Sequence, residues 1–416
     1  QARPAAPRAG RARGLAGSGP MRIGITMLSH DFRLGGPGTY TVEVVSRLLA
    51  LDRANEYVLM YPAFGWARQG FGQYRQHPHV TEVVAQSRVP IKEHWEQLVV
   101  PPVAERHGVD VLFGPLNAIP IRGRFKKVMA MHGVELLTSR DSVTLLRSIR
   151  WRFNLRYVLR AADRILTVSD TMSSVLARVP GLDVSRVRRV YLAASPRFHV
   201  MDDEAILAAF RRKYRLDGPY LLFVGKLFPQ KNASTLFRAF ARIKDRIPHR
   251  VVVVGGVRWK YEEDLALIDE LGIGDRLTLI DHTQPDELAL FYNLADCFIY
   301  PSLYETFGLA QIEAMGCGCP VVASTGGSIP EVAGGAALLV EARDDAALAE
   351  TILRVVTQPE LRADLVRRGF ERAADFSWDK TAMETLRIMQ ELHTGNGPPA
   401  VLTTGAGGPR AGAKGR

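Results

Sequence analysis

Short apolar runs alternate with longer segments of helical periodicity, and the alternation occurs twice along the chain. Runs rich in Val, Ile and Leu that are separated by amphipathic segments are typical of parallel sheets covered by helices on both faces. The expected strands are 22–27, 57–61, 109–113, 127–131 and 164–168, and then 220–224, 250–254, 277–280, 297–300, 320–323 and 337–340. The pattern predicts an α/β protein with two doubly wound, Rossmann-like domains.

The 416 residues suit two domains, each with its own core. A charged, helical piece bounded by prolines separates the two groups of strands. We expect a disordered basic extension at 1–20, an N-terminal domain at 21–196, a linker at 197–217, a C-terminal domain at 218–376, a helix at 377–393 that could pack on either domain, and a disordered tail at 394–416.

The formal net charge of +11 is concentrated near the two ends of the sequence. Residues 1–20 carry four arginines and no acid, and three more basic residues follow His393. The charge elsewhere is spread thinly, so it does not indicate a nucleic-acid groove, and a sugar nucleotide or an anionic lipid would suit it equally well. A nucleic acid is therefore not the expected partner.

Neither a run of eighteen apolar residues nor a secretory h-region is present, which favours a cytoplasmic protein. Arginines and aromatic residues are interleaved over 145–160, either as an ordinary solvated helix or as a peripheral contact with the inner face of an anionic membrane. The three cysteines, Cys297, Cys317 and Cys319, lack the spacing of a zinc site or a disulfide framework, and we expect them to be packing residues.

Two glutamates flank an expected helix start in the second domain. Glu305 belongs to the loop after strand 297–300, whereas Glu313 lies on the helix that begins near Gly308. Eight helical steps would span about 12 Å, longer than the roughly 5–9.5 Å between the paired carboxylates of a glycoside hydrolase. The pair therefore suits an elongated ligand, in which Glu305 accepts hydrogen bonds from sugar hydroxyls and Glu313 from a ribose. A helix-start acid with a surface acid is the alternative.

Three further loops follow strands, where ligands bind in open parallel sheets. The glycines around Gly36 precede a helix expected near Thr39 and could admit a phosphate, or could simply form a turn. His132 could donate a hydrogen bond to a sugar hydroxyl or a phosphate, or could be an ordinary loop histidine. Lys226 and Lys231 could neutralise a diphosphate leaving group, or could be a solvated pair.

The segment 281–284 also follows a strand, and His282 and Thr283 could contact a nucleobase there or belong to a plain loop. A metal-dependent transferase would need a pair of acidic residues near the phosphates to bind the metal, and no such pair follows any strand of the first domain. We therefore expect no metal or other cofactor, with positive charge supplied by lysines and helix ends.

Together these motifs resemble the family 4 (group 1) retaining glycosyltransferases, whose two domains face a central cleft in the GT-B fold. The resemblance covers nearly all of residues 21–392. It is carried by the glutamate pair, by Gly225-Lys226-Leu227 with Lys231, by 326–331 (GGSIPE), by 35–38 (GGPG) and by 162–169 (ADRILTVS).

The resemblance implies metal-independent, retaining transfer of a hexose, with mannose or glucose favoured. The donor would be a nucleotide diphosphate sugar and the acceptor a glycan or lipid-linked hydroxyl in polysaccharide or glycoconjugate synthesis. It assigns Glu305 and His132 to the sugar, Glu313 to the ribose, and Lys226, Lys231, Gly36 and the amides of Phe307, Gly308 and Leu309 to the diphosphate.

Two departures from the family pattern stand out. Lys226 replaces a more frequent arginine, which removes bidentate phosphate contact. Residues 191–194 (YLAA) replace an Asn-Gly turn. A nucleotide-sugar hydrolase-epimerase of the same fold and a catalytically silent binding subunit are the alternative functions.

Overall fold

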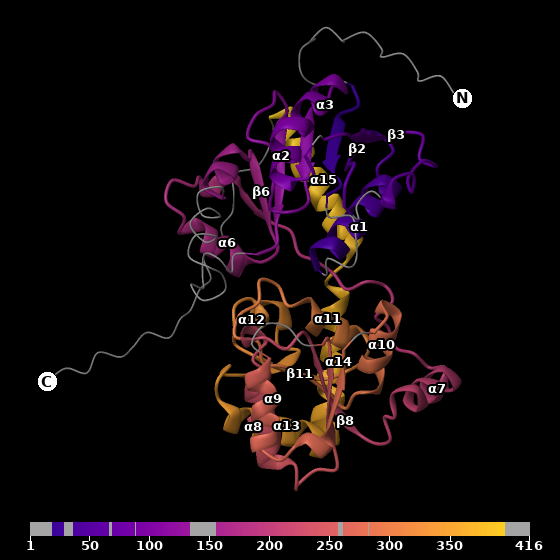
Figure 1. Ribbon diagram of the computed structural model, residues 1–416, viewed down its shortest axis with the longest axis vertical. Helices are drawn as coiled ribbons and strands as arrows, with labels where there is room; N and C mark the ends of the chain where they lie inside the picture. The colour runs from indigo at the N-terminus through magenta and orange to yellow at the C-terminus, as the bar shows by residue number, and fades with distance from the viewer. Residues whose placement is uncertain are drawn as a thin grey trace, which may run out of the picture.

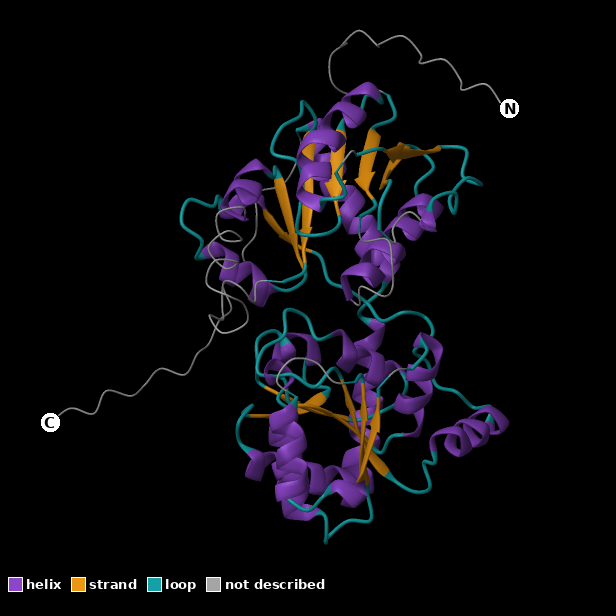
Figure 2. Ribbon diagram, viewed as in Figure 1, coloured by secondary structure: helices purple, strands orange, loops and turns teal. Residues whose placement is uncertain are grey.

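The computed structural model describes residues 19–28, 36–65, 69–87, 89–133, 155–256, 261–281 and 283–395. These residues form two lobes, one above the other in Figure 1, and each lobe is a sheet with helices on both faces (Figure 2). The predictions for 1–18 and 396–416, for His282, and for most of the arginine-rich segment 145–160 lie outside the described residues.

The upper lobe holds a seven-stranded parallel sheet. Its strands, in spatial order, are β3 (Val80–Ala85), β2 (Glu56–Pro62), β1 (Arg22–Thr26), β4 (Val111–Gly114), β5 (Lys126–Met131), β6 (Arg164–Thr167) and β7 (Val187–Arg189). The helices are α1 (Gly36–Leu51), α2 (Lys92–His94), a π-helical turn (Trp95–Val99), α3 (Val100–Arg106) and α6 (Asp170–Ala177). The inner strands are buried on both faces, as continuous apolar runs require.

The lower lobe holds a six-stranded parallel sheet. Its strands, in spatial order, are β10 (Leu277–Ile280), β9 (Arg250–Val254), β8 (Tyr220–Val224), β11 (Cys297–Tyr300), β12 (Val321–Ser324) and β13 (Ala337–Val340). The helices are α7 (Glu204–Tyr214), α8 (Ala233–Ile243), α9 (Glu262–Glu270), α10 (Pro285–Leu294), α11 (Leu309–Gly316), α12 (Ile329–Ala333), α13 (Asp345–Thr357) and α14 (Pro359–Ala374). Cys297, Cys317 and Cys319 are buried and free, as expected.

The predicted class of two doubly wound sheets is confirmed, and each expected strand is present. Two edge strands were missed. β7 is only three residues long and carries two arginines, whereas β3 is interrupted by Glu82, so neither reads as an apolar run. Helix α1 begins at Gly36 rather than near Thr39, because Pro37 has no amide hydrogen to lose and its fixed φ suits a first helical turn.

The last helix, α15 (Trp378–Thr394), leaves the lower lobe and packs on the upper one, beside α1 (Figure 1). Trp378, Leu386 and Met389 join the same buried cluster as Leu48 of α1. Thr381 also donates a hydrogen bond from Oγ1 to the carbonyl of Tyr191 at 2.7 Å. The chain therefore crosses between the lobes twice.

Both sheets reverse their strand order at a pair of neighbouring strands, β1 and β4 in the upper lobe and β8 and β11 in the lower one. In doubly wound sheets ligands bind beyond the carboxyl ends of the strands at this point. The loops that follow β8 and β11 carry Lys226, Lys231 and Glu305, so the topology itself brings these residues together.

Candidate active site

The loop after β8 is shaped by two glycines. Gly225 has a φ of +148°, and a Cβ on neighbouring Gly255 would lie 2.7 Å from the Gly225 carbonyl carbon. Only glycine fits such an approach of two chain segments. The chain then turns through a short 3₁₀ helix (Pro229–Lys231) to Asn232, whose side-chain amide donates to the carbonyls of Pro301 and Ala342.

The loop after β11 is bound to the β8 loop along its length. The amide of Leu303 donates to the carbonyl of Gln230 at 2.8 Å, and Nε2 of Gln230 donates to the carbonyl of Tyr304 at 2.9 Å. On the other side, the amide and hydroxyl of Ser328 both donate to the carbonyl of Glu305 at 3.0 Å. The loop that carries Glu305 is therefore held by two other chain segments.

The side chains of Lys231 and Glu305 form an ion pair, with 2.7 Å between Nζ and Oε1. Both side chains are mostly buried, 21% and 14% exposed, and Nζ also lies 5.3 Å from the ring centroid of Tyr300. An ammonium group in this position neutralises the carboxylate and can also face a phosphate. The two residues were assigned to different parts of a donor, and the structure places them in direct contact. Lys226, by contrast, is exposed.

Glu313 lies on α11 with Oε2 3.4 Å from the hydroxyl of Tyr292. Burial raises the pKa of Glu313 to about 7, opposed by the Tyr292 contact and by the charges of Arg197 and Lys231. Burial also raises the pKa of Tyr300, with further contributions from Glu305 and Glu313. Both carboxylates therefore lie near the same phenol.

Helix α11 begins as predicted, after Gly308 at a φ of +92°. Glycine adopts this positive φ without strain, and a Cβ there would also lie 2.7 Å from Nε2 of Gln311. Phe307 is buried against Tyr191 and Phe376, with ring centroids 6.0 and 5.7 Å away. The side chain of Phe307 is thus a packing anchor, and the amides at the start of α11 are the groups that can meet an anion.

His132 follows β5 in the upper lobe and packs edge-on against Tyr40, with ring centroids 4.4 Å apart. Its Nε2 lies 2.8 Å from the carbonyl of Pro115, and because a carbonyl only accepts, this nitrogen carries the proton. Burial lowers the pKa of His132 to about 4, with the Pro115 contact opposing it. The ring is therefore neutral at pH 7, and Nδ1 would accept a hydrogen bond from a hydroxyl rather than donate one.

Gly36 and Thr283 are two other residues predicted to contact the donor. Gly36 opens α1, and a Cβ there would meet no atom within 4 Å. Thr283 follows the edge strand β10, and its hydroxyl lies 3.3 Å from the Glu287 carboxylate at the start of α10. Thr283 thus contacts the start of α10, and its contact with a nucleobase stays a prediction.

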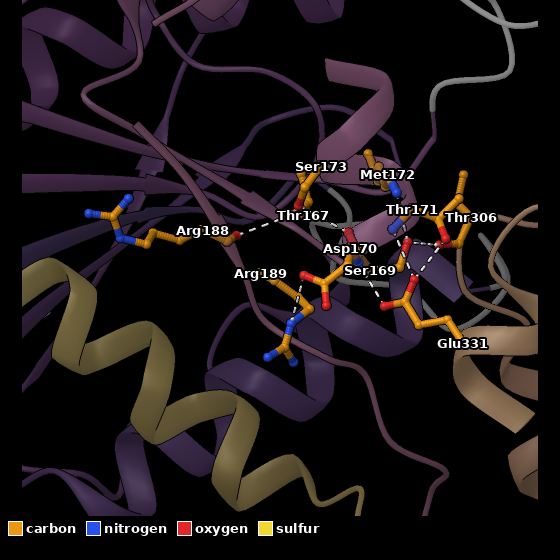
Figure 3. Close-up of polar contacts among 10 residues, drawn as sticks. All are labelled: Thr167, Ser169, Asp170, Thr171, Met172, Ser173, Arg188, Arg189, Thr306 and Glu331. Atoms are coloured by element: carbon orange, nitrogen blue, oxygen red, sulfur yellow. Dashed lines mark hydrogen bonds and ion pairs between the residues drawn. The ribbon is translucent and has the colours of Figure 1, made fainter. Parts of the chain in front are cut away.

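Contacts between the lobes were not expected from the sequence (Figure 3). Glu331 accepts hydrogen bonds from the amides of Asp170 and Thr171, and Ser169 and His132 both bind Thr306. Ser169 and Glu331 are the last residues of two motifs that carry the family resemblance, 162–169 and 326–331, but nothing in the sequence indicates that these two motifs meet.

The arrangement of two doubly wound lobes is shared with solved GT-B proteins. The chain superimposes on sucrose-phosphate synthase from Thermosynechococcus elongatus with a TM-score of 0.70 at 21% identity, covering 90% of this chain and all of that one. It also superimposes on Anabaena HepE in complex with UDP-glucose with a TM-score of 0.70 at 17% identity, covering 89% and 100%. The fold is therefore GT-B.

Sequence comparison relates the lower lobe to a family of glycosyltransferases. Residues 208–372 match the model of the glycosyl transferases group 1. The O-antigen chain mannosyltransferase B of Escherichia coli is 27% identical over 87% of this chain and 97% of its own length. A D-inositol 3-phosphate glycosyltransferase of Acidothermus cellulolyticus is 35% identical over 56% of this chain, and the match spans about half of that relative (54%). Residues 208–372 therefore carry the sequence pattern of the group 1 glycosyltransferases, and both relatives are named mannosyl- or glycosyltransferases.

Two features of the described residues concern metals and membranes. Within that part of the chain, no three His, Cys, Asp or Glu side chains are grouped so that they could hold a metal ion. No helix in the same residues is long and apolar enough to cross a membrane.

Proposed function

We propose that this glycosyltransferase moves a hexosyl group from a nucleotide diphosphate sugar to a hydroxyl of a glycan or lipid-linked acceptor, with retention at the anomeric carbon. The observation that carries the proposal is the Lys231–Glu305 pair at the switch point of the lower sheet, next to the amides that begin α11. Cationic and carboxylate groups side by side match the diphosphate and the sugar of one donor.

The lower lobe would bind the donor. Lys226, Lys231 and the α11 amides offer positive charge to the diphosphate, while Glu313 lies farther along α11 for the ribose hydroxyls. A ribose presents two donors to one carboxylate, and hydrogen bonds to a charged group are stronger than neutral ones. Such contacts would draw Glu313 into its ionised form despite burial.

The ion pair also bears on how the sugar leaves. A carboxylate neutralised by Lys231 is a weakened nucleophile, which supports Glu305 as a group that holds the sugar rather than attacks it. In the step that we favour, the C1–O bond to the diphosphate breaks, and the acceptor oxygen bonds to C1 on the same face. The departing phosphate oxygen takes the acceptor's proton. His132, neutral in this environment, would accept a hydrogen bond from a sugar hydroxyl.

Mannose and glucose are the sugars that we propose. The E. coli relative is named an O-antigen chain mannosyltransferase, and HepE was solved with UDP-glucose. A role in polysaccharide or glycoconjugate synthesis fits both. We further propose that transfer needs no metal, which activity measured in EDTA tests. We also propose that the protein contacts an anionic membrane only peripherally, from the cytoplasmic side, which co-sedimentation with anionic vesicles tests.

The experiment begins with thermal shift over UDP-, GDP- and ADP-sugars, because a bound ligand raises the melting temperature by mass action. The donor that binds is then incubated with and without lipid-linked and glycan acceptors, and nucleotide release is followed. Release that depends on an acceptor supports transfer. Full-rate release from the donor alone would instead show a hydrolase-epimerase, and binding without release a silent subunit.

A further inference from the structure

The carboxylate of Glu331, at the start of α12 in the lower lobe, caps the first turn of α6 in the upper lobe (Figure 3). Oε1 accepts from the amide of Asp170 at 2.7 Å, and Oε2 accepts from the amide and the hydroxyl of Thr171 at 2.9 and 2.8 Å. The first amides of a helix lack partners within the helix and carry partial positive charge. A negative side chain from the opposite lobe satisfies two of them here.

Glu331 is itself held on the side of the lower lobe. Arg372 of α14 donates from Nη2 to the carbonyl of Glu331 and from Nε to the carbonyl of Val332, both at 2.8 Å. On the upper side, Asp170 pairs with Arg189 at 3.1 Å. The cap therefore links two supported segments rather than two loose side chains.

A second link lies beside the candidate catalytic residues. The hydroxyl of Ser169, which immediately precedes α6, donates to the carbonyl of Thr306 at 2.7 Å, and the hydroxyl of Thr306 donates to the carbonyl of His132 at 2.7 Å. Thr306 follows Glu305 in the chain. The position of α6 thus bears directly on the spacing between Glu305 of one lobe and His132 of the other.

We propose that Glu331 is a positioning residue: by capping α6 it holds the two lobes in the arrangement in which Glu305 and His132 reach the same sugar. The inference rests on the proposed function, since it assigns both residues to the donor sugar. Glu331 has no assigned contact with the nucleotide, so its loss should misplace the reacting groups without weakening nucleotide binding. Misplacement of about 1 Å can lower turnover about a hundredfold.

Kinetics with the donor that binds in the thermal-shift screen test the proposal on Glu331→Gln, Glu331→Ala and Glu331→Asp. We expect kcat to fall roughly tenfold to a hundredfold in the Gln and Ala variants, and the dissociation constant of the donor's nucleoside diphosphate to stay within about twofold. Glu331→Asp should restore part of kcat because it keeps the charge. Thr171→Val should lower kcat in the wild type but add little in Glu331→Ala, since interacting residues are non-additive. Exposed Glu270→Gln removes the same charge from α9 and serves as the control.

Hydrogen exchange at single-residue resolution measures the contact between Glu331 and α6 directly and does not depend on an activity assay. In Glu331→Ala the amides of Asp170 and Thr171 should exchange faster, whereas the amide of Met172, which donates to Ser169 Oγ at 3.1 Å, should not change. Unchanged kcat in an active enzyme, unchanged exchange at these amides, or a parallel loss of affinity for the donor's nucleoside diphosphate would each overturn the inference. A wild type that binds a donor but never transfers its sugar would refute the proposed function instead.

Discussion

Replacing Glu313 by Gln should make the protein more stable at neutral and alkaline pH while weakening donor binding. Burial raises the pKa of Glu313 from 4.5 to about 7. Each pKa unit corresponds to about 1.4 kcal/mol, so the ionised carboxylate costs the folded state about 3 kcal/mol. Gln keeps the shape of the side chain and carries no charge at any pH.

The sign of the pH dependence follows from the two states. Below pH 4.5 the carboxyl group is protonated in both the folded and the unfolded chain, so it has no effect on their balance. As the pH rises from 4.5 to about 7, the unfolded chain releases the proton first, and the free energy of unfolding falls. Above about 7 the loss is complete. The advantage of Glu313→Gln should therefore be absent near pH 4.5 and reach about 3 kcal/mol at pH 8.

Thermal unfolding at pH 5 and pH 8 measures this difference. For a domain of this size about 3 kcal/mol corresponds to a rise in Tm of roughly 6–12 °C at pH 8, with a much smaller rise at pH 5. Exposed Glu270→Gln in the same lobe should shift Tm little at either pH. A Glu313→Gln variant that is no more stable at pH 8, or equally more stable at both pH values, would contradict the reasoning.

Although Glu313→Gln should raise stability, it should lower the affinity for the donor. Hydrogen bonds to a charged acceptor contribute about 1.5–3 kcal/mol, so losing the carboxylate should raise the Kd for a nucleotide sugar roughly tenfold to a hundredfold. In the wild type, affinity should increase as the pH rises through about 7, because the ribose prefers the ionised form of Glu313. Calorimetry in buffers of different ionisation enthalpy should show a proton released on binding near neutrality.

Further outcomes follow from the same loops. Glu305→Ala should mainly lower kcat whereas Glu313→Ala mainly weakens donor binding, and steady-state kinetics with equal, small effects from both would refute the site. Lys231→Met removes the ion-pair partner of Glu305 and a cation that would face the diphosphate, so kcat/KM should fall, whereas Lys231→Arg keeps the charge and should retain part of the activity. Gly327→Ala places a Cβ 2.3 Å from the carbonyl oxygen of Glu305, so it should lower the free energy of unfolding by roughly 1–3 kcal/mol and abolish most activity. Gly335→Ala is the control, because Gly335 also has a positive φ but a Cβ there meets nothing within 4 Å. It should destabilise the protein less in unfolding experiments and leave activity intact.

The sequence was sufficient for the fold because apolar periodicity is a local signal. Buried strands such as β8 and β11 appear as unbroken apolar runs, and the order of parallel strands then places the loops that follow them side by side. The start of helical periodicity after Gly308 likewise placed Glu305 in a loop and Glu313 on a helix. The edge strands β3 and β7 escaped because one side of each is unpaired and polar residues are tolerated there.

Contacts between distant side chains left no such signal. Lys231 and Glu305 lie 74 positions apart, and Glu331 lies 161 positions from Asp170. Each contact depends on how loops close after both sheets have formed, and neither a period nor a spacing in the sequence records that geometry. The sequence also could not predict that Nδ1 of His132 accepts a hydrogen bond, because the tautomer of the ring depends on the carbonyl of Pro115.

The return of α15 to the upper lobe has a consequence for biosynthesis. Its buried face, with Trp378, Leu386 and Met389, covers apolar residues of α1 that were synthesised more than three hundred positions earlier. The lobe that leaves the ribosome first is therefore the one completed last. Until residues 378–394 emerge, nascent chains expose an unfinished hydrophobic surface on α1, and we expect chaperones to bind them there.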